Sequence, residues 1–160
     1  MEIKKRVFVD MDDVLVDYAS GFEGLEGTSL WKDKTLSGVF YRMKPMPGAI
    51  EAFNRLASKY DVYVLSTGAW RNEGSWSDKL RWVKKYLGKN AYKRLILTHN
   101  KALCIGDYLI DDRTTNGAGE FVGEHIHFGT EKFPDWEAVL EYLGVNNEDL
   151  QQTRLERRTA

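Results

Sequence analysis

The chain has 160 residues, of which 42% are hydrophobic, which suits one compact domain with a single core and excludes a disordered chain. Its 23 Lys and Arg side chains almost balance 24 Asp and Glu, so no overall charge would attract nucleic acid or an anionic membrane. A single cysteine, Cys104, excludes an internal disulfide, and the lack of a signal-like or membrane-spanning apolar run predicts a soluble cytoplasmic protein.

Five short apolar runs predict β-strands. They are rich in β-branched and aromatic residues and do not alternate with polar ones, which is typical of strands covered on both faces. The runs lie at residues 7–9, 62–65, 95–97, 108–110 and 125–128.

Between the first two strands, residues 18–47 interrupt the alternation of strands and helices. Glycines punctuate this segment, and Pro45 and Pro47 close it. We therefore expect a small insertion over the ligand crevice, a reduced cap built from one or two short helices.

The helix between the second and third strands is predicted from an apolar stripe at helical spacing, formed by Trp76, Leu80, Val83 and Leu87. Ser75 and Asp78 have the spacing of a capping box at its start. Gly88 suits the position just after its end.

Two further helices are predicted, one over residues 50–60 and one that follows Pro134 and stops at Gly144. The segment 146–160 is polar and charged and is expected to be a solvated tail. One folded domain should therefore cover residues 1–145.

Strands that alternate with helices predict an α/β fold, a doubly wound, Rossmann-like parallel sheet with helices on both faces. In such sheets, ligands bind beyond the carboxyl ends of the strands. The segments with polar side chains at these positions are 10–13, 66–70, 98–101 and 111–113.

Acidic side chains follow two of the predicted strands. Asp10, Asp12 and Asp13 follow the first strand, and Asp111 and Asp112 follow the fourth. Two such clusters at neighbouring strand ends would repel each other without a cation between them, and oxygen ligands favour Mg²⁺. Aspartates also cap helices and form turns, which would explain a single pair. Their repetition after two buried strands favours a magnesium site.

Hydroxyl and ammonium groups follow two other strands. Ser66 and Thr67 precede Gly68, and their hydroxyls could bind phosphate oxygens together with the N–H groups of the turn, although a helix N-cap explains them equally well. Lys101 could neutralise a phosphate. Without the acidic clusters, a surface lysine would be the better interpretation.

Other site signatures are missing. There is no P-loop, and residues 117–123 miss the dinucleotide-binding fingerprint by one residue and do not directly follow a strand. His99, His125 and His127 lack metal-site spacing with cysteines, and a structural role is expected for the last two.

Four motifs in order resemble those of haloacid dehalogenase-like phosphatases. They are DMDDV at 10–14, ST at 66–67, Lys101, and GDYLIDD at 106–112. More narrowly, LILTHNK at 95–101 and LIDDR at 109–113 are similar to the 5'(3')-deoxyribonucleotidase family. The likeness extends from Arg6 to about Leu143.

The resemblance implies covalent catalysis. Asp10 would attack the phosphorus and become an aspartyl-phosphate, and Asp12 would protonate the leaving alkoxide and then deprotonate a water molecule. Ser66 and Lys101 would hold the transferred phosphoryl group.

The resemblance also implies a metal site. Mg²⁺ would be bound by Asp10, the backbone carbonyl of Asp12, and Asp112. Asp111 would orient water or Lys101 without binding the ion itself.

The chain departs from the family in two ways. Asp13 stands where the superfamily more often has glycine, and Asp tolerates the backbone angles of such a turn better than most residues. The segment that carries the cap is shorter here than in the family. The resemblance therefore predicts the catalytic residues better than the substrate specificity. Tyr18 matches an aromatic position near the family's substrate, and Trp70 and Trp76 could stack on a base. Packing is the better interpretation of each ring taken alone, and Tyr18 is the best functional candidate.

The sequence therefore predicts a Mg²⁺-dependent phosphomonoesterase that hydrolyses 5'- or 3'-(deoxy)nucleoside monophosphates. The first alternative is a broader phosphatase for sugar phosphates or terminal nucleic-acid phosphates, because a small cap leaves the crevice open. The second is a non-catalytic nucleotide-binding module, which the presence of both Asp10 and Asp12 disfavours. Oligomeric state stays open.

Overall fold

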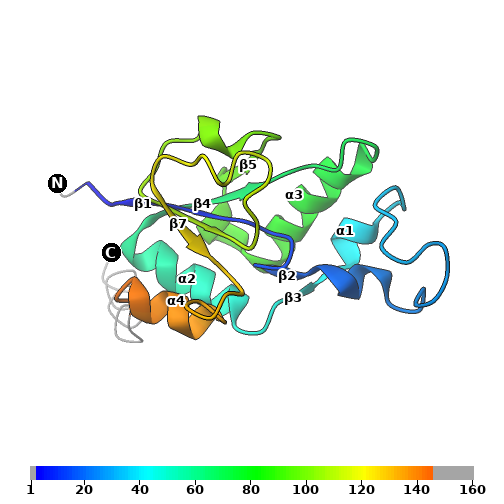
Figure 1. The fold of residues 1–160 in the computed structure, drawn as a ribbon, viewed down its shortest axis with the longest axis horizontal. Helices are drawn as coiled ribbons and strands as arrows, with labels where there is room; N and C mark the ends of the chain where they lie inside the picture. The colour runs from blue at the N-terminus through cyan, green and yellow to red at the C-terminus, as the bar shows by residue number, and fades with distance from the viewer. Residues whose placement is uncertain (1–2, 146–160) are drawn as a thin grey trace.

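The computed structural model describes residues 3–145, and its centre is a parallel five-stranded sheet (Figure 1). The strand order is β5-β4-β1-β6-β7, and each neighbouring pair is parallel. The strands are β1 (Arg6–Val9), β4 (Asp61–Ser66), β5 (Leu95–Leu97), β6 (Tyr108–Asp111) and β7 (Glu124–His127). All five predicted strands and the α/β fold are confirmed.

The register of the central strands brings the motif residues to one edge. Val9 lies opposite Val64 of β4 and Ile110 of β6. The residue after β1, Asp10, continues this pairing through its backbone N–H, which donates to the carbonyl of Ile110 at 2.9 Å. Because the strands are parallel, their carboxyl ends open on the same crevice.

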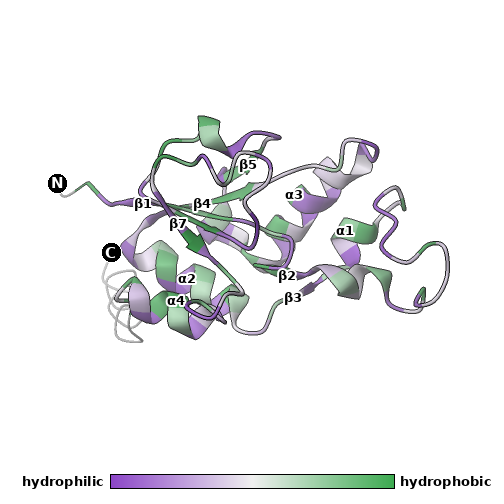
Figure 2. Cartoon of the chain, viewed as in Figure 1, coloured by the Kyte–Doolittle hydropathy of each residue, from purple (hydrophilic) through white to green (hydrophobic). Residues whose placement is uncertain are grey.

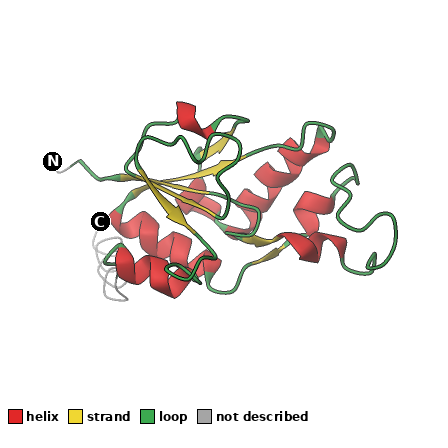
Figure 3. Cartoon of the chain, in the orientation of Figure 1, coloured by secondary structure: helices red, strands yellow, loops and turns green. Residues whose placement is uncertain are grey.

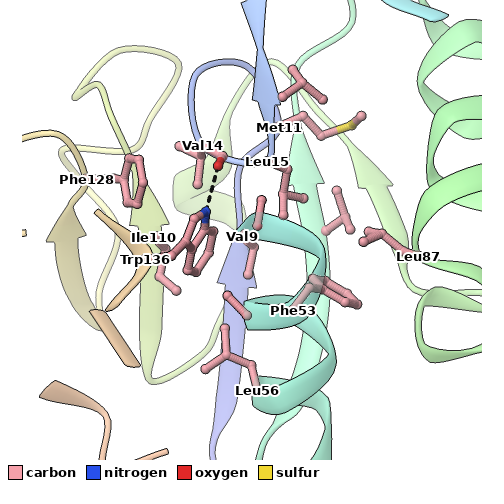
Figure 4. Close-up of a cluster of buried hydrophobic side chains, with 14 of the residues drawn as sticks. Val9, Met11, Val14, Leu15, Phe53, Leu56, Leu87, Ile110, Phe128 and Trp136 are labelled. Atoms are coloured by element: carbon pink, nitrogen blue, oxygen red, sulfur yellow. Dashed lines mark hydrogen bonds between the residues drawn. The ribbon is translucent and has the colours of Figure 1, made fainter. Parts of the chain in front are cut away.

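Three α-helices cover one face of the sheet: α2 (Ala49–Lys59), α3 (Gly74–Tyr86) and α4 (Trp136–Tyr142). Val7 and Val9 point into this layer, which forms the larger apolar core. The indole N–H of Trp136 donates to the carbonyl of Val14 at 2.9 Å and so ties α4 to the turn after β1 (Figure 4). Among the described residues, no helix is long and apolar enough to cross a membrane.

The second face of the sheet is covered by loops and the short 3-10 helix η3 (Lys101–Leu103) (Figure 3). A smaller cluster of Phe8, Leu65 and Leu109 packs there against Ala118 and Phe121. The three central strands, β1, β4 and β6, are therefore mostly buried, and the edge strands β5 and β7 are less so. Figure 2 shows hydrophobic residues along the sheet. Within residues 3–145, the expected helices on both faces are three α-helices on one face and the 3-10 helix η3 on the other.

The helix α3 forms where expected but presents another face. Trp76 and Leu80 are 39% and 42% exposed, so the predicted apolar stripe is wrong in its first half. The buried side chains of this helix are Ser75, Asp78, Lys79, Trp82 and Val83.

The predicted capping box of α3 is also wrong. The N-cap is Glu73, and no side chain caps the helix. The hydroxyl of Ser75 accepts instead from the N–H of Ala69 at 2.9 Å, and so braces the loop after β4. Gly88 does follow the C-cap residue, with a positive φ of 55°, as expected.

Residues 18–47 contain two short helical segments, η1 (Tyr18–Phe22) and α1 (Val39–Arg42). A two-stranded antiparallel sheet, β2 (Val16–Asp17) with β3 (Lys44–Pro45), joins them to the rest of the chain. The segment projects beyond the carboxyl end of β1 (Figure 1). A role as a cap, and the division into a domain at 1–145 and a tail, stay predictions; the tail at 146–160 lies outside the described residues.

Candidate active site

The turn after β1 places the first carboxylates of the site. Asp13 adopts a left-handed conformation with φ 58°, which confirms that Asp accommodates this turn. Its N–H donates to the carbonyl of Val16 at 2.8 Å, and its Oδ1 accepts from the N–H of Tyr18 at 3.2 Å. The turn is thus closed from both sides, with Asp10 and Asp12 lining a cavity at the sheet edge.

Lys101 lies between the two acidic clusters. Its Nζ donates to Asp10 Oδ1 at 2.7 Å and to Asp111 Oδ2 at 2.5 Å, and the side chain is 3% exposed. The segment that carries it is held by Asn116, whose carbonyl accepts from the Lys101 N–H at 2.7 Å. A Cβ on Gly117 would lie 2.2 Å from Asn100 Oδ1, so only glycine permits this close approach.

Asp10, Asp111 and Asp112 could together hold a cation, since one carboxylate oxygen from each lies within 4.8 Å of the others. Both oxygens of Asp111 are occupied, by Lys101 and by the N–H of Arg113. Asp112 Oδ1 is buried and has no hydrogen-bond partner among the described residues. Because a buried carboxylate oxygen without a partner is costly, a divalent cation fits this position, beside Asp112 more than Asp111.

Burial controls the charge of these groups. Burial raises the pKa of Asp10 to about 7. The Lys101 ammonium lowers this pKa, and the Asp111 carboxylate raises it further. Burial raises the pKa of Asp112 as well, again with a contribution from Asp111. Burial lowers the pKa of Lys101, but the Asp10 and Asp111 carboxylates have the larger combined effect, and the pKa of Lys101 is raised. The lysine therefore stays charged, and a further cation would favour the ionised forms of Asp10 and Asp112.

Lys79 is a site residue that the sequence did not reveal. It is 1% exposed, and its Nζ donates to both carboxylate oxygens of Asp12, at 3.1 and 3.0 Å, and to Ser66 Oγ at 2.8 Å. The available signal was its helical spacing from Trp82, which places both on one face of α3. Lys79 thus fixes the carboxylate of Asp12 beside the cavity.

The two predicted phosphate-binding hydroxyls are both engaged with the protein. Ser66 accepts from Lys79 and is 1% exposed. Thr67 lines the cavity, but its hydroxyl donates to the carbonyl of Thr98 at 2.9 Å. Their phosphate contacts stay predictions.

The aromatic candidates differ in position. Tyr18 is buried, and its hydroxyl has no partner among the residues that the structure describes. Burial, together with the nearby Asp12 carboxylate, raises the pKa of Tyr18 to about 12. Trp70 is 83% exposed and packs edge-on against His99, with ring centroids 5.4 Å apart. Trp76 contacts the same ring in a tilted arrangement, with centroids 5.9 Å apart. None of the three aromatic rings lines the cavity.

Two histidines support the second acidic pair from β7. His125 Nε2 lies 3.1 Å from the carbonyl of Asp111, and His127 Nε2 lies 2.9 Å from the carbonyl of Asp112. Their rings stack with centroids 5.1 Å apart. Both bond the main chain, which agrees with the structural role expected of them.

The cavity at this edge has a volume of about 100 Å³. Its walls come from the ends of all the motif segments and from the insertion, which contributes Lys34 and Phe40. Arg113 is a further lining cation and lies 3.5 Å from Asp112 Oδ2. Lys34 was not predicted to be a site residue, because it follows no predicted strand. Arg113 lies in the segment 111–113 expected at this edge, but it was given no role. The structure brings Asp10, Asp12, Lys101, Asp111 and Asp112 to one cavity.

Comparison with known proteins gives consistent results. The sequence model of the family described as "5' nucleotidase, deoxy (Pyrimidine), cytosolic type C protein" matches residues 21–137. A putative 5'(3')-deoxyribonucleotidase of Vibrio phage KVP40 is 56% identical over 151 residues, which cover 90% of this chain and 87% of the relative. The human mitochondrial 5'(3')-deoxyribonucleotidase is 29% identical over 182 residues, covering 91% and 73%. The human cytosolic type is 28% identical over 168 residues, covering 84% and 78%.

Proposed function

Because the chain belongs to the deoxy (pyrimidine), cytosolic type C family of 5' nucleotidases, which are haloacid dehalogenase-like phosphatases, we propose that it hydrolyses 5'- or 3'-(deoxy)nucleoside monophosphates in the cytoplasm. The single observation that carries the proposed chemistry is the contact of Lys101 with both Asp10 and Asp111 in one cavity. This contact supports a site in which Asp10 as the proposed nucleophile, the Lys101 cation and Asp111, which would orient the lysine, surround the space for one phosphoryl group.

Mg²⁺ is the cation that we assign to this cavity. Asp10, Asp112 and the backbone carbonyl of Asp12 would hold it, and the unpartnered Oδ1 of Asp112 supports this choice. Magnesium would polarise the phosphoryl oxygens and balance the charge that develops on them. Asp111, whose oxygens are taken by Lys101 and the Arg113 N–H, would orient the lysine instead.

Asp10 is the proposed nucleophile. Its carboxylate oxygen forms a bond to phosphorus while the ester P–O bond breaks, which leaves an aspartyl-phosphate and an alkoxide. Lys101 donates to Oδ1 of Asp10 and lines the same cavity, so it would lower the repulsion between a carboxylate and a phosphate dianion. Water then attacks the phosphorus and releases inorganic phosphate and free Asp10.

Asp12 is the proposed acid and base. It gives a proton to the leaving alkoxide in the first step and takes one from water in the second. Lys79 holds the carboxylate through both of its oxygens, so that it can serve the same site in both steps. Ser66, bonded to the same ammonium, is a hydroxyl that we assign to the phosphoryl group.

A broader phosphatase is the second candidate. The cavity has room for about three water molecules, at roughly 30 Å³ each, so the rest of any substrate must lie outside it. Trp70 is exposed and follows residues 68–69, which line the cavity. Its ring could stack on a base that stays open to solvent on its other side. An open mouth of this kind would admit sugar phosphates or terminal phosphates of nucleic acid as well.

Substrate profiling tests the proposal. Nucleoside monophosphates, sugar phosphates and 3'-phosphorylated oligonucleotides are compared with and without Mg²⁺, with Asp10→Asn as the inactive variant and Glu120→Gln, an exposed position, as the control. We expect nucleotide turnover that needs Mg²⁺ and is abolished by Asp10→Asn, because an amide is a poor nucleophile. Undiminished turnover in that variant would contradict the covalent role.

A further inference from the structure

Lys34 is a cation of the cavity that comes from the insertion and not from the sheet. The cavity is lined by three basic side chains, Lys34, Lys101 and Arg113. Lys101 pairs with Asp10 and Asp111, and Arg113 lies 3.5 Å from Asp112. Lys34 has no ion pair within residues 3–145; its Nζ lies over the ring of Tyr18, 5.6 Å from the centroid.

The main chain of Lys34 is held in place although its side chain is exposed. The amide of Asn72 donates to the carbonyl of Lys34 at 2.8 Å and to that of Leu36 at 3.1 Å. Asp33 Oδ1 accepts from the N–H and the hydroxyl of Thr35, at 2.9 and 2.7 Å. The backbone at Lys34 is therefore fixed by a buried amide and by an Asp33 side chain.

Asn72 belongs to the loop that leaves the predicted phosphate-binding segment. Its N–H donates to the carbonyl of Ala69 at 3.0 Å, and its carbonyl accepts from the N–H of Ser75 at 3.0 Å. Ala69 itself lines the cavity. One buried residue, 8% exposed, therefore ties Lys34 of the insertion to the wall formed after β4.

The size of the cavity indicates which part of a substrate meets Lys34. A volume of about 100 Å³ suits a phosphoryl group, with the nucleoside outside. Four carboxylates, Asp10, Asp12, Asp111 and Asp112, line the same space. A dianion that enters beside them is favoured most by a cation that no carboxylate neutralises.

We propose that Lys34 binds the phosphoryl group of the substrate from the insertion side, and that Asn72 is the residue that positions it. This inference rests on the proposed phosphatase function and names a substrate-binding contact of the same site. The insertion thus contributes a cation to the phosphate site. Lys34 lowers KM for the substrate and takes no part in bond breaking.

Kinetics of Lys34→Met test the contact, with Lys32→Met, at an exposed lysine two residues earlier, as the matched control. We expect KM for a nucleoside monophosphate and the inhibition constant of inorganic phosphate to rise by the same factor, about ten-fold or more, since a charge-assisted hydrogen bond is lost. The value of kcat should change by less than about two-fold. Lys34→Arg should recover most of the affinity, and Lys32→Met should behave as wild type.

The positioning role of Asn72 is tested by a double-mutant cycle. Asn72→Ala should raise KM in the same direction as Lys34→Met, and should add nothing to KM in the Lys34→Met background. Additive effects would overturn the positioning role, because they would mean that Asn72 acts independently of Lys34. Thermal unfolding of each variant separates this from a general loss of stability.

Calorimetric titration with inorganic phosphate in the presence of Mg²⁺ makes the test independent of turnover. An unchanged phosphate affinity in Lys34→Met would overturn the proposal even if the enzyme is a nucleotidase. If no phosphate ester is hydrolysed, the proposed function fails, but the comparison of phosphate affinities still decides whether Lys34 binds the anion.

Discussion

Lys79 Nζ and the carboxylate of Asp12 form an ion pair with N–O distances of 3.1 and 3.0 Å, although 67 residues separate them in the sequence. The lysine reaches the site from the middle of α3, and the aspartate from the turn after β1. The pair couples the helical layer to the proposed acid and base. Its lysine is 1% exposed, so a single substitution on the helix leaves the carboxylate without its cation.

Lys79→Met should lower kcat by roughly ten- to hundred-fold, because Asp12 loses the contact that orients it for proton transfer. The loss should be greater with a nucleoside monophosphate, a poor leaving group, than with an activated aryl phosphate. Steady-state kinetics on both esters measure this difference. Lys84→Met, an exposed lysine on the same helix, is the control, and equal losses on the two esters would contradict the orienting role.

Asp112→Asn should raise the Mg²⁺ concentration for half-maximal activity by about ten-fold or more, because it removes a charged ligand. Asp111→Asn should act mainly on kcat, since Asp111 bonds Lys101 and the Arg113 N–H. Activity measured against Mg²⁺ concentration separates the two variants. If both shift the Mg²⁺ requirement equally, the assignment of Asp112 as the ligand and Asp111 as its neighbour is wrong.

Without divalent cations, the stability of the protein should fall as pH rises from about 4 to about 7. The pKa of Asp10 is raised by burial from its ordinary 3.8 to about 7, so the native state binds more protons than the unfolded state within that window. Deprotonation therefore favours unfolding as pH increases. Thermal unfolding in a chelator across this range measures the slope.

Asp10→Asn should flatten this pH dependence, because the amide does not titrate. Addition of Mg²⁺ to the wild type should also flatten it, since the cation binds the ionised carboxylates and not the protonated ones. A cation-free wild type whose stability rises over the same range would be inconsistent with the burial effect on Asp10.

Asp13→Ala should lower the free energy of unfolding by about 1–2 kcal/mol. Alanine is strained in the left-handed conformation and cannot accept the hydrogen bond from the N–H of Tyr18. Asp13→Gly should be more stable than the alanine variant by about 1 kcal/mol, since glycine adopts a positive φ freely. Denaturant unfolding of both variants gives the difference. Equal stabilities would show that the turn relaxes when Asp13 is replaced.

Some of the site could be predicted because its signals are local in the chain. Asp10 and Asp111 follow buried runs directly, and a parallel sheet brings the ends of neighbouring strands together. The left-handed turn at Asp13 is local too, since it depends on that residue's own backbone angles. Errors arose where two helical faces compete: Trp76 and Leu80 have the spacing of a buried stripe, but the buried face carries Lys79 and Trp82.

The sequence by itself determined the five strands, their parallel arrangement and the edge at which the carboxylates gather, because continuous apolar runs and the residues that end them are properties of short segments. Only the tertiary structure decided which cations meet those carboxylates. Trp82 donates to the carbonyl of Met43 at 2.8 Å, a contact that seats α3 against the returning end of the insertion. The orientation of α3 places Lys79 beside Asp12, and this ion pair makes the burial of the lysine tolerable. A partner so distant in the chain cannot be predicted from a local pattern.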